Sequence, residues 1–264
     1  MILESLKALS TPATSQAKRL GLVYEAVAIE ARAKRCRMAW RPHLQASKKE
    51  INASLETMKE QGHVVVLGSG CLNDIDIEPL IKKARQIDLI DIVQTHKARR
   101  VARNHNKIRL IEADVTGLAD DFLRCSDHQK GPMPSPSPSF EFMDASPNLT
   151  VSLNLLSQLA LPFLRHKQSQ PLSDEEASNF EEYLMRNHIE SLRALPGQKL
   201  LITDIQRRYH TSKNVEVDDV LPASLGLPAP RSTWIWTVAP KGETKPWEKI
   251  EHQVGAFDLN EEGS

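Results

Sequence analysis

Apolar residues near the start of the chain recur at helical spacing. Four of them, at steps of three or four residues, define one face of a helix: Leu20, Val23, Val27 and Ala31. Pro42 lacks a backbone N–H, so we expect it to end or kink this helix near Trp40. A second helix is predicted after it, with Ser47 as N-cap, Glu50 at the capping-box position and Gly62 just past its end.

From residue 63 onward, short apolar runs alternate with helical patterns. Seven runs are predicted as strands: 63–68, 86–93, 107–115, 148–161, 198–205, 232–240 and 252–259. A long helical pattern begins at Ser173, an N-cap candidate with Glu176 at the capping-box position. Alternating strands and helices are typical of βαβ units around a parallel sheet. We therefore predict an N-terminal helical extension over residues 1–62 and one α/β domain over residues 63–264.

Residues 124–147 interrupt this alternation. They are rich in serine and proline, a composition that does not pack as a regular element. The segment is predicted to be a surface loop, and an insertion without a role of its own is favoured over an active-site lid.

Composition adds constraints on partners rather than on fold. The 264 residues carry no net charge, so no global field would recruit nucleic acid or an anionic membrane, although a local basic face stays open. The three cysteines are widely spaced and form no zinc or disulfide pattern. Residues 1–16 lack signal-peptide features, and no run approaches the roughly 18 apolar residues of a membrane span. We expect a soluble, cytoplasmic protein, and the sequence leaves a homodimer open.

The run "VVVLGSG" leads a buried strand into a glycine turn. Gly68 and Gly70 lack a Cβ atom and adopt positive φ easily, so a ligand or a neighbouring element can approach the backbone there. Asp91 ends the next strand about 20 residues later, where an acid in dinucleotide folds accepts hydrogen bonds from ribose. A glycine turn or a strand-end acid alone is also common in proteins that bind no ligand there. Their occurrence together, in this order, favours a nucleoside site.

These features resemble the class I, Rossmann-like methyltransferases that use S-adenosylmethionine, in particular bacterial members whose activity is inferred rather than established. The resemblance spans roughly residues 63–259 and is carried by four segments: "VVVLGSG", "LIDIV", "RLIEADVTG" and "TWIWTVAP". It implies a seven-stranded, mostly parallel sheet with helices on both faces and an antiparallel C-terminal hairpin.

The resemblance also implies S-adenosylmethionine as cofactor and a set of residues that would hold it. These are Gly68, Ser69, Gly70, Asp91, Ile92, Ala113, Asp114, Val115 and Asn154. Asp114 and Ala113 would border the adenine. Asn154, at the tip of the fourth strand, would face the methionine part and the methyl acceptor, and it is the one candidate for orienting the acceptor.

The chain departs from the family pattern at the glycine turn. Leu67 stands where the family has an acid before the first glycine, and Leu72 stands where it has a third glycine. In the dinucleotide spacing GxGxxG, the last position is Asn73. Asp74 and Asp76 follow closely; they are candidates for the missing carboxylate, although capping the next helix is the favoured role. These departures put cofactor affinity in doubt.

Two further clusters of side chains are candidates for acceptor binding. Asp204 is predicted to end the fifth strand, and an Arg-Arg-Tyr-His run follows it at 207–210, suited to an anionic acceptor but equally to solvation. Trp40 and His43 flank the proline bend; we expect Trp40 in the core and His43 on the surface. Neither a GxSxG nor a GxxxxGK[ST] motif occurs, which disfavours hydrolase and NTPase activities.

The sequence therefore supports one leading function and two alternatives. The leading hypothesis is a methyltransferase for a small-molecule acceptor, with neither nucleic acid nor membrane as a partner. Methyl transfer from a sulfonium is a displacement that depends mainly on placement of the acceptor, so a strong catalytic motif is not required. The first alternative is a methyltransferase-like domain that only binds or scaffolds, motivated by the missing acid and glycine. The second is a nicotinamide-dependent oxidoreductase, which the turn fits poorly.

Overall fold

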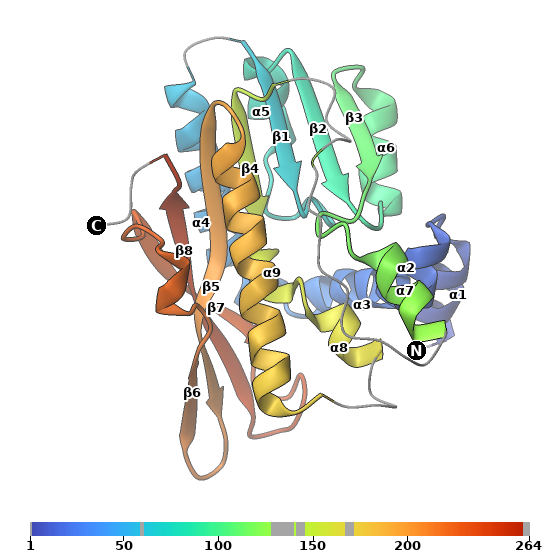
Figure 1. The fold of residues 1–264 in the computed structure, drawn as a ribbon, viewed down its shortest axis with the longest axis vertical. Helices are drawn as coiled ribbons and strands as arrows, with labels where there is room; N and C mark the ends of the chain where they lie inside the picture. The colour runs from blue at the N-terminus through green and yellow to red at the C-terminus, as the bar shows by residue number, and fades with distance from the viewer. Residues whose placement is uncertain (1, 59–60, 128–139, 141–145, 167–171, 261–264) are drawn as a thin grey trace.

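The computed structural model describes residues 2–58, 61–127, 140, 146–166 and 172–260, and its centre is one twisted sheet (Figure 1). The strands are β1 (His63–Leu67), β2 (Gln86–Asp91), β3 (Ile108–Glu112), β4 (Leu149–Leu153), β5 (Gln198–His210), β6 (Val215–Asp219), β7 (Ser232–Ala239) and β8 (Lys249–Asp258). Their order is β3-β2-β1-β4-β5-β8-β7, and β6 pairs with β5 off this path.

The five parallel strands follow the order 3-2-1-4-5 of doubly wound folds, and β8 and β7 continue the sheet as an antiparallel hairpin. The predicted α/β fold is confirmed. β1 pairs with both β2 and β4, so the strand order reverses between β1 and β4, and ligands of doubly wound folds bind at the carboxyl ends of the strands at such a point.

Helices cover both faces of the sheet. The N-terminal helices are α1 (Ile2–Ser10), α2 (Ser15–Arg19), α3 (Leu22–Arg35) and α4 (Arg37–Thr57); the others are α5 (Ile77–Lys83), α6 (His96–Asn104), α7 (Ala119–Asp127), α8 (Leu161–His166), α9 (Asp174–Ala194) and the short η1 (Leu156–Gln158) and η3 (Ala223–Leu225). One buried cluster joins α4, α5 and α6 to one face, and another joins α7, α8 and α9 to the opposite face. Helices α1, α2 and α3 form a separate small cluster over the end of β2.

The N-terminal helices differ from the prediction. The helical pattern breaks at Cys36, between α3 and α4, and α4 then runs through Pro42 in its second turn, where the missing N–H removes one helical hydrogen bond without ending the helix. Ser47 is a fully buried residue inside α4 instead of an N-cap. Gly62 serves packing instead of capping, because a Cβ atom there would lie 2.0 Å from Asn148 Oδ1.

Strand β5 is much longer than predicted. It continues past Asp204 to His210, with an irregularity in its pairing to β8 between Asp204 and Gln206. Strand β6, which pairs with this outer half, was not predicted at all. All five residues of β6 are exposed, so its alternating valines face no core and the segment has the composition of a loop.

Other predictions are confirmed or fall outside the described residues. Ser173 caps α9, and Glu176 completes the capping box, as predicted. Most of the segment 124–147 lies outside the described residues. Within the described ranges, none of the helices is both long and apolar enough to span a membrane.

Candidate functional site

The two glycines of the turn have different surroundings. Both have positive φ, +76° for Gly68 and +48° for Gly70. A Cβ atom on Gly68 would lie 2.8 Å from the carbonyl oxygen of Leu153, so this glycine makes room for the end of β4. A Cβ atom on Gly70 would meet only Gly68 O at 3.8 Å and Asp91 Oδ2 at 3.9 Å, within 4 Å. The backbone is therefore less crowded at Gly70 than at Gly68.

Asp91 points toward this turn. Its Oδ2 accepts a hydrogen bond from Gly70 N at 2.7 Å, and its Oδ1 accepts one from Val93 N at 3.1 Å. Burial raises the pKa of Asp91, and the hydrogen bonds from backbone N–H groups offset this only in part. A carboxyl group with a raised pKa at the end of a strand, beside a glycine turn, is a candidate ligand-binding position.

The residues after β3 are engaged in their own turn. Asp114 Oδ1 accepts from the backbone N and the hydroxyl of Thr116, and its Oδ2 accepts from Leu118 N and Ala119 N. Four donors occupy the roughly four acceptor sites of a carboxylate, so Asp114 shapes the start of α7. Ala113 N donates to Asp91 O at 3.2 Å, which places it beside Asp91, and Val115 lies in the core.

Asn154 lies at the end of β4 in a polar cluster that joins three elements. It adopts a positive φ of 50°, a conformation that asparagine tolerates better than most residues. Its Nδ2 lies 2.9 Å from Asp74 Oδ2 and 3.5 Å from His43 Nε2. Trp234 Nε1 donates to His43 Nδ1 at 3.0 Å. The turn, α4 and β7 thus converge on the amide of Asn154.

Two predictions about this cluster are wrong. His43 was expected on the surface, yet it is 1 % exposed, and burial lowers its pKa to about 3. It stacks on Trp236 with ring centroids 4.1 Å apart. Asp74 was expected to cap α5, but its partner is Asn154. Asp76 occupies the N-cap position instead, and its side chain accepts from Asn52 and pairs with Lys48. Trp40 is buried, as predicted.

A second polar group lies along β5, next to the first. Asp204 accepts from Ser157 Oγ and from Arg207 Nε, the latter at 2.9 Å, and lies 3.3 Å from His252 Nδ1. Burial lowers the pKa of His252 to about 4. His252 in turn contacts Trp236 edge to face, and Trp236 stacks on His43, so the two rings link the Asp204 group to His43.

The predicted anion-binding run after Asp204 does not form one cluster. The irregularity between Asp204 and Gln206 shifts the alternation of side chains along β5 by one residue, so Arg207 lies on the face of Asp204, while Arg208 and His210 lie on the other. Arg208 donates to Gln206 and Gln253, and His210 lies 2.9 Å from Glu251 Oε2. These residues stabilise the long strand pair.

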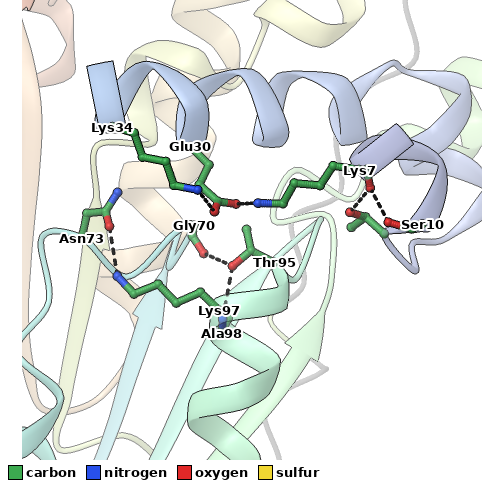
Figure 2. Close-up of polar contacts among 10 residues, drawn as sticks. Lys7, Ser10, Glu30, Lys34, Gly70, Asn73, Thr95, Lys97 and Ala98 are labelled. Carbon is green, nitrogen blue, oxygen red and sulfur yellow. Dashed lines mark hydrogen bonds and ion pairs between the residues drawn. The ribbon is translucent and has the colours of Figure 1, made fainter. Parts of the chain in front are cut away.

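Helix α3 lies over the carboxyl end of β2 and closes the site. Figure 2 shows Glu30 between Lys7 of α1 and Lys34, above Gly70 and Thr95. Burial alone would raise the pKa of Glu30, but the hydrogen bond and charge of Lys7 and the charge of Lys34 outweigh it and lower the pKa. A shallow hollow with almost no enclosed space remains under these helices. Residues from three segments line it: Lys7, Thr11, Ala26, Val27, Glu30, Val93, Thr95 and His96.

Most of the predicted site residues therefore share one edge of the sheet. Gly70, Asp91 and Ala113 lie together around the end of β2, and Ile92 packs against the N-terminal helices. Ser69 is 1 % exposed, and its hydroxyl has no hydrogen-bond partner among the described residues. Cys71 follows the turn as a free thiol, whose pKa burial raises to about 12, so it is not a nucleophile.

Sequence reasoning missed that His43 lies next to Asn154 and that Trp234 and Trp236 lie against His43. Their positions in the chain are far apart, and only the pairing of β7 with β8 and the packing of α4 bring them together. The concentration of tryptophan and histidine in "RCRMAWRPHL" and "TWIWTVAP" was the available signal.

Comparison with known proteins identifies no sequence relative: no family model matches the chain, and no curated protein matches it. Three solved structures illustrate the structural likenesses. The N-methyltransferase NodS from Bradyrhizobium japonicum, in complex with S-adenosylhomocysteine, is 10% identical, with 82% of this chain and 87% of that chain covered and a TM-score of 0.42. The 1,6-didemethyltoxoflavin-N1-methyltransferase of Burkholderia thailandensis is 11% identical, with 94% and 92% covered and a TM-score of 0.44. The glycopeptide N-methyltransferase MtfA is 13% identical, with 78% and 75% covered and a TM-score of 0.37. These TM-scores are low, so the fold rests on the strand order of the sheet itself.

Proposed function

We propose that this protein binds S-adenosylmethionine at the carboxyl ends of β1, β2 and β4 and transfers its methyl group to a small-molecule acceptor. The observation that carries the proposal is the pairing of Asp91 with the Gly70 turn at the point where the strand order reverses. In this proposal residues 63–264 carry the site and α1–α3 cover it.

Asp91 and Gly70 are suited to hold the ribose of an adenosyl group. Asp91 accepts hydrogen bonds from the N–H groups of Gly70, Val93 and Ile92, so about one of its four acceptor sites is left for a ribose hydroxyl. Gly70 offers an open approach to the backbone. Asp114 has its acceptor sites engaged, so the adenine amino group would need another acceptor.

The bound cofactor would supply an electrophilic methyl group on sulfur. The chain's own residues would place the acceptor: Asn154 ends β4 where the strand order reverses, and the neutral rings of His43 and Trp236 form a wall next to it. Since His43 and His252 have pKa values near 3 and 4, neither carries charge at neutral pH. This apolar wall favours a small, uncharged acceptor over nucleic acid.

Titration of S-adenosylhomocysteine into the wild-type protein tests the proposal. Asp91→Ala should weaken binding by about tenfold to a hundredfold, the range expected for a hydrogen bond to a charged group. Asp218→Ala, which changes an exposed acid of β6, should bind like wild type. Absence of both heat and a thermal shift at millimolar ligand would refute the proposal.

One observation favours the alternative of a domain that binds or scaffolds without catalysis. The hollow under α1–α3 encloses almost no free space, far less than a small-molecule site needs, so a cofactor enters only if α1–α3 move. Incubation with S-adenosylmethionine and a fractionated metabolite extract separates the two functions. Formation of S-adenosylhomocysteine above the rate of Asp91→Ala supports a methyltransferase, whereas tight binding without turnover in any fraction supports the alternative.

A further inference from the structure

The hydrogen bond from Trp234 fixes the proton of His43. An indole N–H only donates, and it points at His43 Nδ1 from 3.0 Å, so Nδ1 must accept with a lone pair. The ring is 1 % exposed and burial lowers its pKa to about 3, so it is neutral. A neutral imidazole carries one proton, and here that proton is on Nε2.

This proton conflicts with the arrangement around Asn154. His43 Nε2–H faces Asn154 Nδ2 at 3.5 Å, so two donors oppose each other. If the amide of Asn154 turns over, its oxygen takes the place of Nδ2 and accepts from His43. That oxygen then lies near Asp74 Oδ2, which is 2.9 Å from the present Nδ2 position. Two oxygens at this distance need a hydrogen between them.

We propose that Asp74 is a neutral carboxylic acid in the ligand-free protein, donating its proton to Asn154, and that it gives up this proton when a cationic group binds beside it. The second half rests on the proposed function, because the α-ammonium group of S-adenosylmethionine is the cation considered. The indole N–H of Trp234, both ring nitrogens of His43, the amide oxygen of Asn154 and the acid of Asp74 then each have a partner of the correct kind.

The surroundings of Asp74 favour the neutral form. Burial raises its pKa, and hydrogen bonds and two nearby lysines offset this only in part. The lysines have other acceptors: Lys97 Nζ donates to Leu72 O and Asn73 Oδ1, and Lys48 pairs with Asp76 at 2.9 Å. The ionisable groups around Asp74 come from α4, α6 and the turn, and they are His43, Lys48, Lys97 and Cys71.

The position of Asp74 also makes it accessible to a ligand at the turn. It is only partly buried, four residues after Gly70, and its partner Asn154 is held by a backbone bond from its N–H to Ile202 O. The chain lacks an acid at Leu67, before the first glycine, so Asp74 is the carboxyl group of this turn that lies next to the end of β4.

The step balances with no further reactant. The O–H bond of Asp74 breaks and its proton passes to solvent, while the ligand's ammonium group keeps its own protons and pairs with the carboxylate. Binding of the cation therefore releases one proton. While Asp74 is neutral in the free protein, affinity should rise by about tenfold for each unit of pH.

A nuclear magnetic resonance titration tests the resting state without any ligand. The carboxyl carbon of Asp74, assigned by comparison with Asp74→Asn, should report a neutral acid at pH 6.5, and the nitrogen shifts of His43 should report the tautomer protonated on Nε2. A carboxyl carbon that titrates near the ordinary aspartate value of 3.8 would overturn the proposal. So would a His43 protonated on Nδ1.

Calorimetry at pH 6.5 in buffers of different ionisation enthalpy tests the coupling. S-adenosylhomocysteine should release about one proton from wild type, and 5′-methylthioadenosine, which lacks the ammonium group, should release none. Asp74→Asn should bind S-adenosylhomocysteine at least tenfold more weakly and release no proton, while Asp218→Asn, which changes an exposed acid of β6, should behave like wild type. Proton release by Asp74→Asn, or none by wild type, would overturn the coupling. If wild type binds neither compound, both the proposed function and the coupling are refuted. The magnetic resonance titration then still decides whether Asp74 is neutral in the free protein.

Discussion

Asp88 and Asp91 are three residues apart on β2, yet their surroundings differ in every respect. Asp88 is fully buried in the sheet, 2.8 Å from His63 Nε2 on β1, and its two oxygens accept from Arg109 Nε and Nη2 on β3 at 3.0 and 2.7 Å. Asp91, at the strand end, has backbone N–H groups but no cation among the partners found for it.

The difference is visible in the pKa shifts. Burial alone would raise the pKa of Asp88, but hydrogen bonds from His63, Arg109 and Gln86 outweigh burial and hold its pKa far below the usual range. At Asp91 and at Asp74 burial prevails, and the pKa values are raised. The buried charge of Asp88, inside β1–β3, is therefore paired within the protein. Asp91 and Asp74, at the carboxyl ends of the strands, lack such a cationic partner within the described part of the chain, and a ligand could supply one.

The largest expected effect tests the interior. Asp88→Asn leaves the Arg109 guanidinium and the buried His63 without their carboxylate. We expect a loss of about 3 kcal/mol in the free energy of unfolding, the lower end for a broken buried pair, because Arg109 is 37% exposed. Urea unfolding measures it. Asp91→Asn, the matched change at the edge, should cost less than about 1 kcal/mol; equal losses would remove the distinction between the two acids.

The two glycines extend the comparison to the backbone. Gly68→Ala combines a positive φ with a contact of 2.8 Å to a backbone carbonyl, so we expect a loss of about 3 kcal/mol. The Cβ atom of Gly70→Ala meets only ordinary van der Waals contacts, so this change should cost about 1 kcal/mol, from φ alone. For binding of S-adenosylhomocysteine, measured on the folded fraction, the order should be the opposite: Gly70→Ala should lose more affinity than Gly68→Ala. A Gly70→Ala variant that binds like wild type would place the ligand elsewhere.

The dependence of stability on pH should have opposite signs for the two acids. Because the folded-state pKa of Asp88 lies below its unfolded value of 3.8, its contribution is present above pH 3.8 and is lost as pH falls through the folded pKa. For Asp91 the folded-state pKa is raised, so its contribution is present below pH 3.8 and is lost as pH rises through the folded pKa. The slopes reach at most about 1.4 kcal/mol per unit of pH.

Unfolding of wild type against each asparagine variant, between pH 2.5 and 7, isolates these two contributions. The difference between wild type and Asp88→Asn should shrink only on the acid side. Above pH 3.8, the free energy of unfolding of wild type should fall relative to that of Asp91→Asn as pH rises. A common direction for both pairs would show that one of the two pKa shifts has the wrong sign.

The same contrast explains what the sequence could and could not predict. Buried runs such as residues 63–67 have apolar side chains on both faces, so they indicate interior strands, and the glycine turn and Asp91 follow from them in order. β6 stayed hidden because all its residues are exposed, and His43 because its partners, Trp234 and Asn154, come from distant segments. Local pattern thus located the strand ends, but contacts between distant segments decide which side chains meet there.

The smallest expected effect concerns the helices that cover the edge. Lys7 of α1 pairs with Glu30 of α3 at 2.6 Å, across the hollow beside Thr95. The side chains are 31% and 16% exposed, so Lys7→Ala should cost at most about 1 kcal/mol of stability. Because this pair ties α1 to α3 over the hollow, its loss should speed amide exchange in α1.

If the helices must move to admit a ligand, the same change should tighten binding of S-adenosylhomocysteine by up to about fivefold, which corresponds to about 1 kcal/mol. Lys34→Ala is the matched control, since Lys34 pairs with the same Glu30 but lies on the same helix, four residues on, and ties nothing across the hollow. It should leave exchange in α1 and ligand affinity unchanged. Equal effects of the two variants would mean that the charge of Glu30, and not the tie between α1 and α3, governs access to the carboxyl edge.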